Sequence, residues 1–290
     1  MHRTIVNWSA APSRVDWFMS RVSSASCLFP AIAVVVAGCA TAPQVRQPPR
    51  VLLAARGVVF VADGAGGGDG TTRSFRRALE EEGVPLSVEG FNWSHGFGRY
   101  ISDERDSSHA RERGRELADH VASYRAHAPN GEVYLVAHSA GSAVVLNAAE
   151  ALPPNSINRI ILLSPSVSAD RDLRPALRCT RDGVDVFCSR MDWFYLGFGT
   201  SVFGTSDGRW RAAAGRIGFR TKVEEPGDAA LYTRLRQHPW DPAVEWTGNH
   251  GGHYGGHEGS FLHAYVVPLF TTRAAGPAHD PNGQINLPSY

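Results

Sequence analysis

Residues 133–152 constrain the fold of this 290-residue chain more than any other stretch does. A short apolar run at 133–136 leads to Ser139, and a helix-compatible run follows at 142–152. The residues beside the serine are small: Ala137, Ala140 and Gly141. This pattern predicts a buried strand, a sharp turn with the serine at its tip, and a helix that returns so closely that only small side chains fit.

Short apolar runs alternate with helix-compatible segments along the rest of the chain. We expect strands within 51–61 and at 86–91, 160–163 and 184–189, and helices near 71–82, 105–126, 171–178 and 261–270. This alternation predicts an α/β fold with a doubly wound, mostly parallel sheet. Ligands of such sheets bind beyond the carboxyl ends of the strands, so a functional site is expected at that edge.

The first 38 residues have the features of an export signal. An apolar run at 27–38 follows Arg14 and Arg21, and it is too short to span a bilayer as a helix. The run ends in Val-Ala-Gly-Cys at Cys39, which resembles the lipobox of bacterial lipoproteins, where the cysteine is acylated. We therefore expect Cys39 to carry a lipid that anchors the exported protein to a membrane of the bacterial cell envelope.

These features divide the chain into a signal peptide (1–38), a proline-containing tether (39–50) and one folded domain (51–290). Either Met1 or Met19 fits as the start of the signal. The 29 Lys and Arg residues nearly balance the 28 Asp and Glu residues, and no basic stripe is present. Nucleic acid is therefore not expected as a partner.

From residue 58 to residue 270 the chain resembles the α/β-hydrolase family. The sequence Ala-His-Ser-Ala-Gly around Ser139 is close to the G-x-S-x-G nucleophile elbow of that family, with Ala137 in place of the first glycine. A glycine-rich loop at 64–68 and candidate acid and histidine residues further along extend the likeness. The resemblance implies a serine hydrolase without a cofactor, with its triad in the chain order serine, acid, histidine.

Asp192 is the expected acid of such a triad. It begins the loop after the expected strand at 184–189, which is where the family places this residue. Asp207 is the reserve candidate. Asp185 lies within the strand, so its side chain is expected to point into the flank of the sheet.

The glycine-rich segment at 249–261 supplies the expected histidine. We favour His253, because it lies in mid-loop after glycines that allow a close approach, and His257 is the second candidate. His250, His253 and His257 are also a candidate metal site. The interleaved glycines disfavour a helix that would align these three residues, and only Glu258 lies nearby to complete a ligand set, so no metal is expected.

Hydrolysis also requires an oxyanion hole. The resemblance implies that one donor is the backbone N–H of Ala140 and that the second comes from the loop after the first strand, at Ala65 or Gly66. The same loop lacks the features of a phosphate-binding loop, since no Lys-Ser/Thr follows and the glycines do not fit G-x-G-x-x-G.

Cys179 and Cys188 are expected to form a disulfide, because export places them in an oxidising compartment; the alternative is two buried free thiols. The long stretch between Asp192 and His253 has the length for a small cap.

Together these features predict a membrane-tethered, esterase- or lipase-like enzyme that acts on a small-molecule ester or a lipid. Ser139 would attack, His253 would transfer the proton and Asp192 would orient the imidazole. The alternative is a non-catalytic lipoprotein with a hydrolase fold that binds a partner in the cell envelope. The acyl and alcohol groups of the substrate do not follow from the sequence.

Overall fold

The computed structural model describes residues 56–192, 205–208 and 212–271. The expected signal peptide, the tether and Cys39 lie outside the described residues, and they stay predictions. None of the helices in the described ranges has the length and hydropathy that a bilayer crossing requires.

Six strands form one sheet in the order β2-β1-β3-β4-β5-β6, and every pair of neighbours in it is parallel. The strands are β1 (Gly57–Ala62), β2 (Leu86–Gly90), β3 (Glu132–His138), β4 (Arg159–Leu163), β5 (Val184–Cys188) and β6 (Leu235–Pro239). All residues of β1, β4 and β5 are buried, as expected for strands covered on both faces. The predicted doubly wound, parallel α/β sheet is confirmed.

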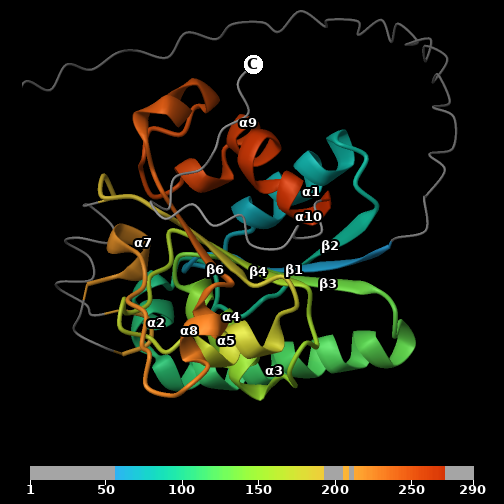
Figure 1. Ribbon diagram of the computed structural model, residues 1–290. Coiled ribbons are helices and arrows are strands. Elements are labelled where there is room, and N and C mark those ends of the chain that lie inside the picture. The colour runs from blue at the N-terminus through green and yellow to red at the C-terminus, as the bar shows by residue number, and fades with distance from the viewer. Residues whose placement is uncertain (1–55, 193–204, 209–211, 272–290) are drawn as a thin grey trace, which may run out of the picture. The chain divides into compact units, whose positions relative to one another are not determined.

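Helices cover both faces of this sheet (Figure 1). One layer contains α3 (Ser107–His127), α4 (Gly141–Ala151) and α5 (Arg174–Cys179), and the other contains α1 (Gly70–Glu81), α9 (Gly259–Phe261) and α10 (Pro268–Thr271). Each layer packs its own apolar cluster against the sheet, with Leu117 buried in the first and Phe75 in the second. Burying a side chain of this size stabilises the fold by roughly 1.5–3 kcal/mol.

The two central strands send the chain in opposite directions. After β1 the chain enters α1 on one face and returns to β2, whereas after β3 it enters α4 on the other face and returns to β4. Ala62 pairs with Ala137, so the segments that follow β1 and β3 leave the sheet at the same level. A crevice opens where neighbouring strands diverge in this way, and it is the usual ligand site of such sheets.

The described part of the stretch between Asp192 and His253 contributes to the sheet. It forms α7 (Ala214–Ile217), α8 (Asp228–Tyr232), β6 and the 3-10 helix η2 (Pro242–Thr247), while residues 193–204 and 209–211 lie outside the described residues. Strand β6 was not predicted, because it is a half-buried edge strand with polar residues in its middle. The short helix α2 (Tyr100–Arg105) was not predicted either.

The expected closing helix at 261–270 is divided. A turn of π-helix, η4 (Leu262–Val266), follows α9, and α10 begins at Pro268. Proline lacks the N–H that a continuous helix needs at that position, which explains the division.

The predicted disulfide is wrong, because Cys179 and Cys188 are both buried free thiols. Cys179 ends α5 before β5 begins, whereas Cys188 is the last residue of β5. A strand rises about 3.3 Å per residue, so Cys188 lies at the carboxyl end of β5 while Cys179 lies near its amino end. The length of the strand exceeds the roughly 7 Å between Cα atoms that a disulfide can span. Burial raises the pKa of Cys179 to about 12 and that of Cys188 to about 11.

Candidate active site

Ser139 occupies the sharp turn between β3 and α4. Its φ is 52°, in the left-handed region that a serine adopts only when the surroundings impose it. Three backbone hydrogen bonds hold it there: its N–H donates to Leu163 at 3.0 Å, and its carbonyl accepts from Ser142 and from Ser166, each at 3.1 Å. The turn is therefore over-determined, which keeps the serine side chain at the carboxyl edge of the sheet.

Close packing accounts for the small residues around the serine. A Cβ on Gly141 would lie 2.3 Å from the carbonyl oxygen of Ala62, so only glycine fits where α4 begins beside the end of β1. A Cβ on Gly64 would lie 3.5 Å from the Cβ of Ser139, which places the loop after β1 directly beside the serine.

Ser139, His253 and Asp192 form one line of hydrogen bonds. The Nε2 atom of His253 lies 2.9 Å from the Oγ of Ser139, and its Nδ1 lies 2.6 Å from the Oδ2 of Asp192. A carboxylate can only accept, so the Nδ1–H donates to Asp192 and the Nε2 lone pair is left to accept the serine proton. All three side chains are buried, with Ser139 only 6% exposed.

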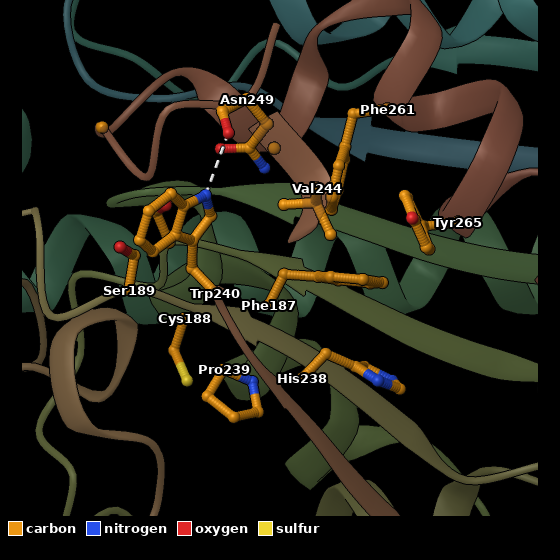
Figure 2. Close-up of a pocket in the computed structure, with 13 residues that line it drawn as sticks. Phe187, Cys188, Ser189, His238, Pro239, Trp240, Val244, Asn249, Phe261 and Tyr265 are labelled. Carbon is orange, nitrogen blue, oxygen red and sulfur yellow. Dashed lines mark hydrogen bonds between the residues drawn. The ribbon is translucent and has the colours of Figure 1, made fainter. Parts of the chain in front are cut away.

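These three residues follow the carboxyl ends of different strands. Ser139 follows β3, Asp192 lies shortly after β5, and His253 lies on the loop that follows β6 and η2. That loop is held at its start by Trp240, whose indole N–H donates to the carbonyl of Asn249 at 2.9 Å (Figure 2). Parallel strands bring all their carboxyl ends to one edge, which explains how residues so distant in sequence meet.

Ala140 and Ala65 are the expected sources of oxyanion donors, with Gly66 as the alternative to Ala65. Within the described residues, the N–H groups of Ala140 and Ala65 have no hydrogen-bond partner. The alternative donor Gly66 is wrong, because its N–H donates to the Oδ2 of Asp103 at 2.7 Å. Asp103 is 1% exposed and anchors the loop after β1 from helix α2, a contact for which the sequence holds no signal.

Glu104, the next residue of α2, is also close to the elbow. Its Oε2 accepts from the hydroxyl of Ser166 at 3.0 Å, and the N–H of Ser166 donates to the carbonyl of Ser139. Burial raises the pKa of Glu104 to about 7, although the bond from Ser166 acts in the opposite direction. The structure thus links a buried carboxyl group to the backbone of Ser139 through Ser166.

The other candidate acids have different partners. Asp207 accepts from the N–H of Ser168 at 3.1 Å and from the hydroxyl of Thr205 at 2.5 Å, so it stabilises a loop. Asp185 is fully buried in a cluster with Arg159, Arg236 and His238. Burial alone would raise its pKa, but the hydrogen bonds of this cluster hold the pKa of Asp185 well below its usual range.

The other candidate histidines do not contact Ser139 in the described structure. His257 lies in the 3-10 turn η3 (Gly255–His257), and its Nδ1 is 3.1 Å from the hydroxyl of Thr71 in α1. Burial, followed by the charge of a protonated His253, lowers the pKa of His257 to about 4. His250 is exposed. Among the described residues, no three His, Cys, Asp or Glu side chains are grouped as a metal site would require.

A small cavity lies behind the histidine loop, between β5, β6 and the helical turns that follow them (Figure 2). Phe187, His238, Trp240 and Phe261 are among its lining residues. Its volume is about 40 Å³, which is room for only a few water molecules.

Residues 54–201, slightly more than half of the chain, match the family model described as serine aminopeptidase, S33. The chain belongs to this α/β-hydrolase family. The match covers the strand-turn-helix elbow and Asp192, and it ends before His253. The comparison with curated proteins found no match.

Several solved structures are similar to this S33 hydrolase in fold. An α/β serine hydrolase homologue from Coxiella burnetii is 12% identical, covers 74% of this chain and 82% of its own, and has a TM-score of 0.41. The catalytic core of acetyl xylan esterase from Trichoderma reesei is 11% identical, with coverages of 74% and 99% and a TM-score of 0.40. A cutinase from the same organism is 17% identical, with coverages of 74% and 76% and a TM-score of 0.35. At these scores the likeness bears on neither substrate nor catalytic residues.

Proposed function

We propose that this serine hydrolase cleaves carboxylic esters through a triad of Ser139, His253 and Asp192. The single observation that supports the triad is the continuous, buried line of hydrogen bonds from the serine hydroxyl to the aspartate, at 2.9 Å and 2.6 Å. The same line also contains the three residue types in the order that acyl transfer requires.

In the first half of the reaction, the Oγ of Ser139 attacks the ester carbonyl carbon while Nε2 of His253 takes the hydroxyl proton. The Asp192 carboxylate keeps Nδ1 protonated and stabilises the imidazolium that forms. The tetrahedral intermediate collapses as His253 passes the proton to the leaving alkoxide, which departs as an alcohol. A water molecule then repeats the sequence on the acyl-serine, with His253 as base, and releases the carboxylic acid.

The negative oxygen of the tetrahedral intermediate needs fixed donors. The N–H groups of Ala140 and Ala65 fit this role, because each is unpaired within the described residues. Ala140 follows Ser139 in the chain, and Ala65 follows Gly64, which lies beside Ser139. Loss of one such donor typically reduces kcat by about 10²–10³-fold.

A fluorophosphonate probe tests the serine directly, since it phosphonylates only activated serines. We expect the folded wild-type protein to be labelled and Ser139→Ala to remain unlabelled. A folded wild type without labelling would favour the alternative function, a non-catalytic lipoprotein that binds a partner in the envelope.

Two substrate panels test the bond that is cleaved. We expect turnover of p-nitrophenyl esters, and the acyl length that is cleaved fastest indicates the substrate class. We expect much slower turnover of aminoacyl p-nitroanilides, because p-nitroaniline is a poorer leaving group than p-nitrophenolate. Faster cleavage of the anilides would replace the ester proposal by an aminopeptidase.

The sequence also supports a location in the cell envelope, through a lipid on Cys39. In a bacterial host, a clickable palmitate analogue should label the wild-type chain and should not label Cys39→Ser. Equal labelling of both chains would contradict the anchor, and it would leave the catalytic proposal unaffected.

A further inference from the structure

His138, the residue before the nucleophile, contacts the loop of the expected base. It ends β3 and its side chain is 3% exposed. Its Nε2 lies 3.0 Å from the backbone carbonyl oxygen of His253. One side chain thus joins the strand that carries Ser139 to the residue that must accept its proton.

The chemistry of this contact defines the tautomer of His138. A carbonyl oxygen only accepts, so Nε2 carries a hydrogen and donates it, and Nδ1 of the neutral ring carries none. Burial, with the charges of His253 and His257 as further causes, lowers the pKa of His138 well below its usual range. The ring therefore remains a neutral, single donor when His253 becomes an imidazolium.

Ring contacts support the same arrangement. The His138 ring stacks on that of His257 at 5.0 Å between centroids, and it lies 4.8 Å from the ring of His253. A Cβ on Gly64 would lie 3.0 Å from its Nδ1, so the loop after β1 passes close to this ring.

We propose that His138 is a positioning residue for the catalytic base: its Nε2–H holds the carbonyl of His253, and with it the loop at 249–257, against the strand of the nucleophile. This inference rests on the proposed function and goes beyond it. The loop contains four glycines, which favour backbone motion. Because a displacement of about 1 Å at a reacting group can cost about 10²-fold in rate, such a tie affects kcat.

Two substitutions separate the donor from the volume of the ring. His138→Gln places an amide N–H near the position of Nε2, whereas His138→Met has a similar length and no donor. We expect His138→Met to reduce kcat on a soluble p-nitrophenyl ester by about 10- to 100-fold with KM changed less than about threefold. We expect His138→Gln to recover most of this loss. If the Met variant does not fold, His138→Asn replaces it, since its shorter amide does not reach the carbonyl.

His109 provides a matched control. Its Nε2–H donates to the backbone carbonyl of Trp93 at 2.7 Å, which is the same kind of bond on an element that does not carry the histidine loop. His109→Met should keep kcat within about threefold of wild type, an effect below about 0.7 kcal/mol. An equal loss in this variant would assign the effect of His138 to general destabilisation and would overturn the inference.

Proton NMR gives a readout that does not depend on turnover. The Nδ1–H of His253, bonded to Asp192, should give a far-downfield signal in the wild type and in His138→Gln, and that signal should be lost in His138→Met. An unchanged signal or an unchanged kcat in His138→Met would overturn the inference. Absence of probe labelling on the wild type would instead refute the proposed function. In that case the NMR signal would still show whether His138 positions the ring of His253.

Discussion

Replacing Asp192 by asparagine removes one charge from the line of hydrogen bonds and leaves its shape unchanged. The wild-type carboxylate accepts from Nδ1 of His253 at 2.6 Å, and both side chains are almost completely buried. An asparagine at 192 can meet this ring in two ways. In the first, the amide oxygen accepts from Nδ1–H; in the second, the amide N–H₂ donates to a deprotonated Nδ1.

The surroundings of Asp192 decide between these two arrangements. Its Oδ1 atom has no hydrogen-bond partner among the described residues. The first arrangement would therefore bury an unpaired N–H₂ group, which costs about 1–3 kcal/mol. In the second, the unpaired position holds an amide oxygen, as it does in the wild type, so no new donor is left unpaired there. This arrangement places the proton of His253 on Nε2, where the ring can no longer accept the proton of Ser139. The wrong tautomer should thus dominate.

We expect Asp192→Asn to lower kcat by about 10³–10⁴-fold, which corresponds to about 4–5.5 kcal/mol in the activation free energy. KM should change little, because the carboxylate does not contact substrate. The assay is turnover of a soluble p-nitrophenyl ester at neutral pH, with circular dichroism to check the fold. Asp207→Asn is the matched control, since Asp207 binds Ser168 and Thr205 within a loop. A folded Asp192→Asn within tenfold of wild type, or an equal loss in Asp207→Asn, would refute the reasoning.

Two further substitutions test the elbow and its neighbouring carboxyl group. Gly141→Ala should lower the free energy of unfolding by about 1–3 kcal/mol, because its Cβ would meet the Ala62 carbonyl at 2.3 Å. This overlap outweighs the roughly 1 kcal/mol by which alanine favours a helix over glycine. Urea unfolding measures the change, and unchanged stability would contradict the close approach. Glu104→Gln should remove a pH dependence of stability. Between pH 4.5 and about 7 native Glu104 holds a proton that the unfolded chain has released, so the wild type loses up to about 3 kcal/mol as pH rises through this window. Parallel pH profiles of the unfolding free energy for the two proteins would show that Glu104 ionises normally.

Much of the fold follows from local patterns in the sequence. The strands at β3, β4 and β5 are short apolar runs between turn residues, and the small residues around Ser139 predict the elbow. Strand β6 has no such pattern, because an edge strand with half-buried residues can carry Arg236, Gln237 and His238. The pairing of Arg236 and His238 with the buried Asp185 becomes visible only when β5 and β6 lie side by side.

The sequence likewise indicated some residues of the candidate site, whereas others could be assigned only from the structure. Order along the chain and loop position indicated Asp192 and His253, and both lie within hydrogen-bond distance in one line with Ser139. Gly66 and Ala65 could not be separated from the sequence, because both are small residues in one glycine-rich loop. The contact from Asp103 to the Gly66 N–H distinguishes them, and it depends on how helix α2 packs. The disulfide prediction relied on cysteine spacing and compartment, and it did not account for the length of β5.

The sequence by itself determined the alternation of strands and helices and the strained turn at Ser139, because both depend on residues that are neighbours in the chain. Only the tertiary structure brought the Nε2 of His138 to the carbonyl of His253, 115 residues away, and the side chain of Asp103 to the N–H of Gly66. Such contacts form when parallel strands bring their carboxyl ends to one edge, and the local sequence does not encode the angle and distance at which distant loops then meet.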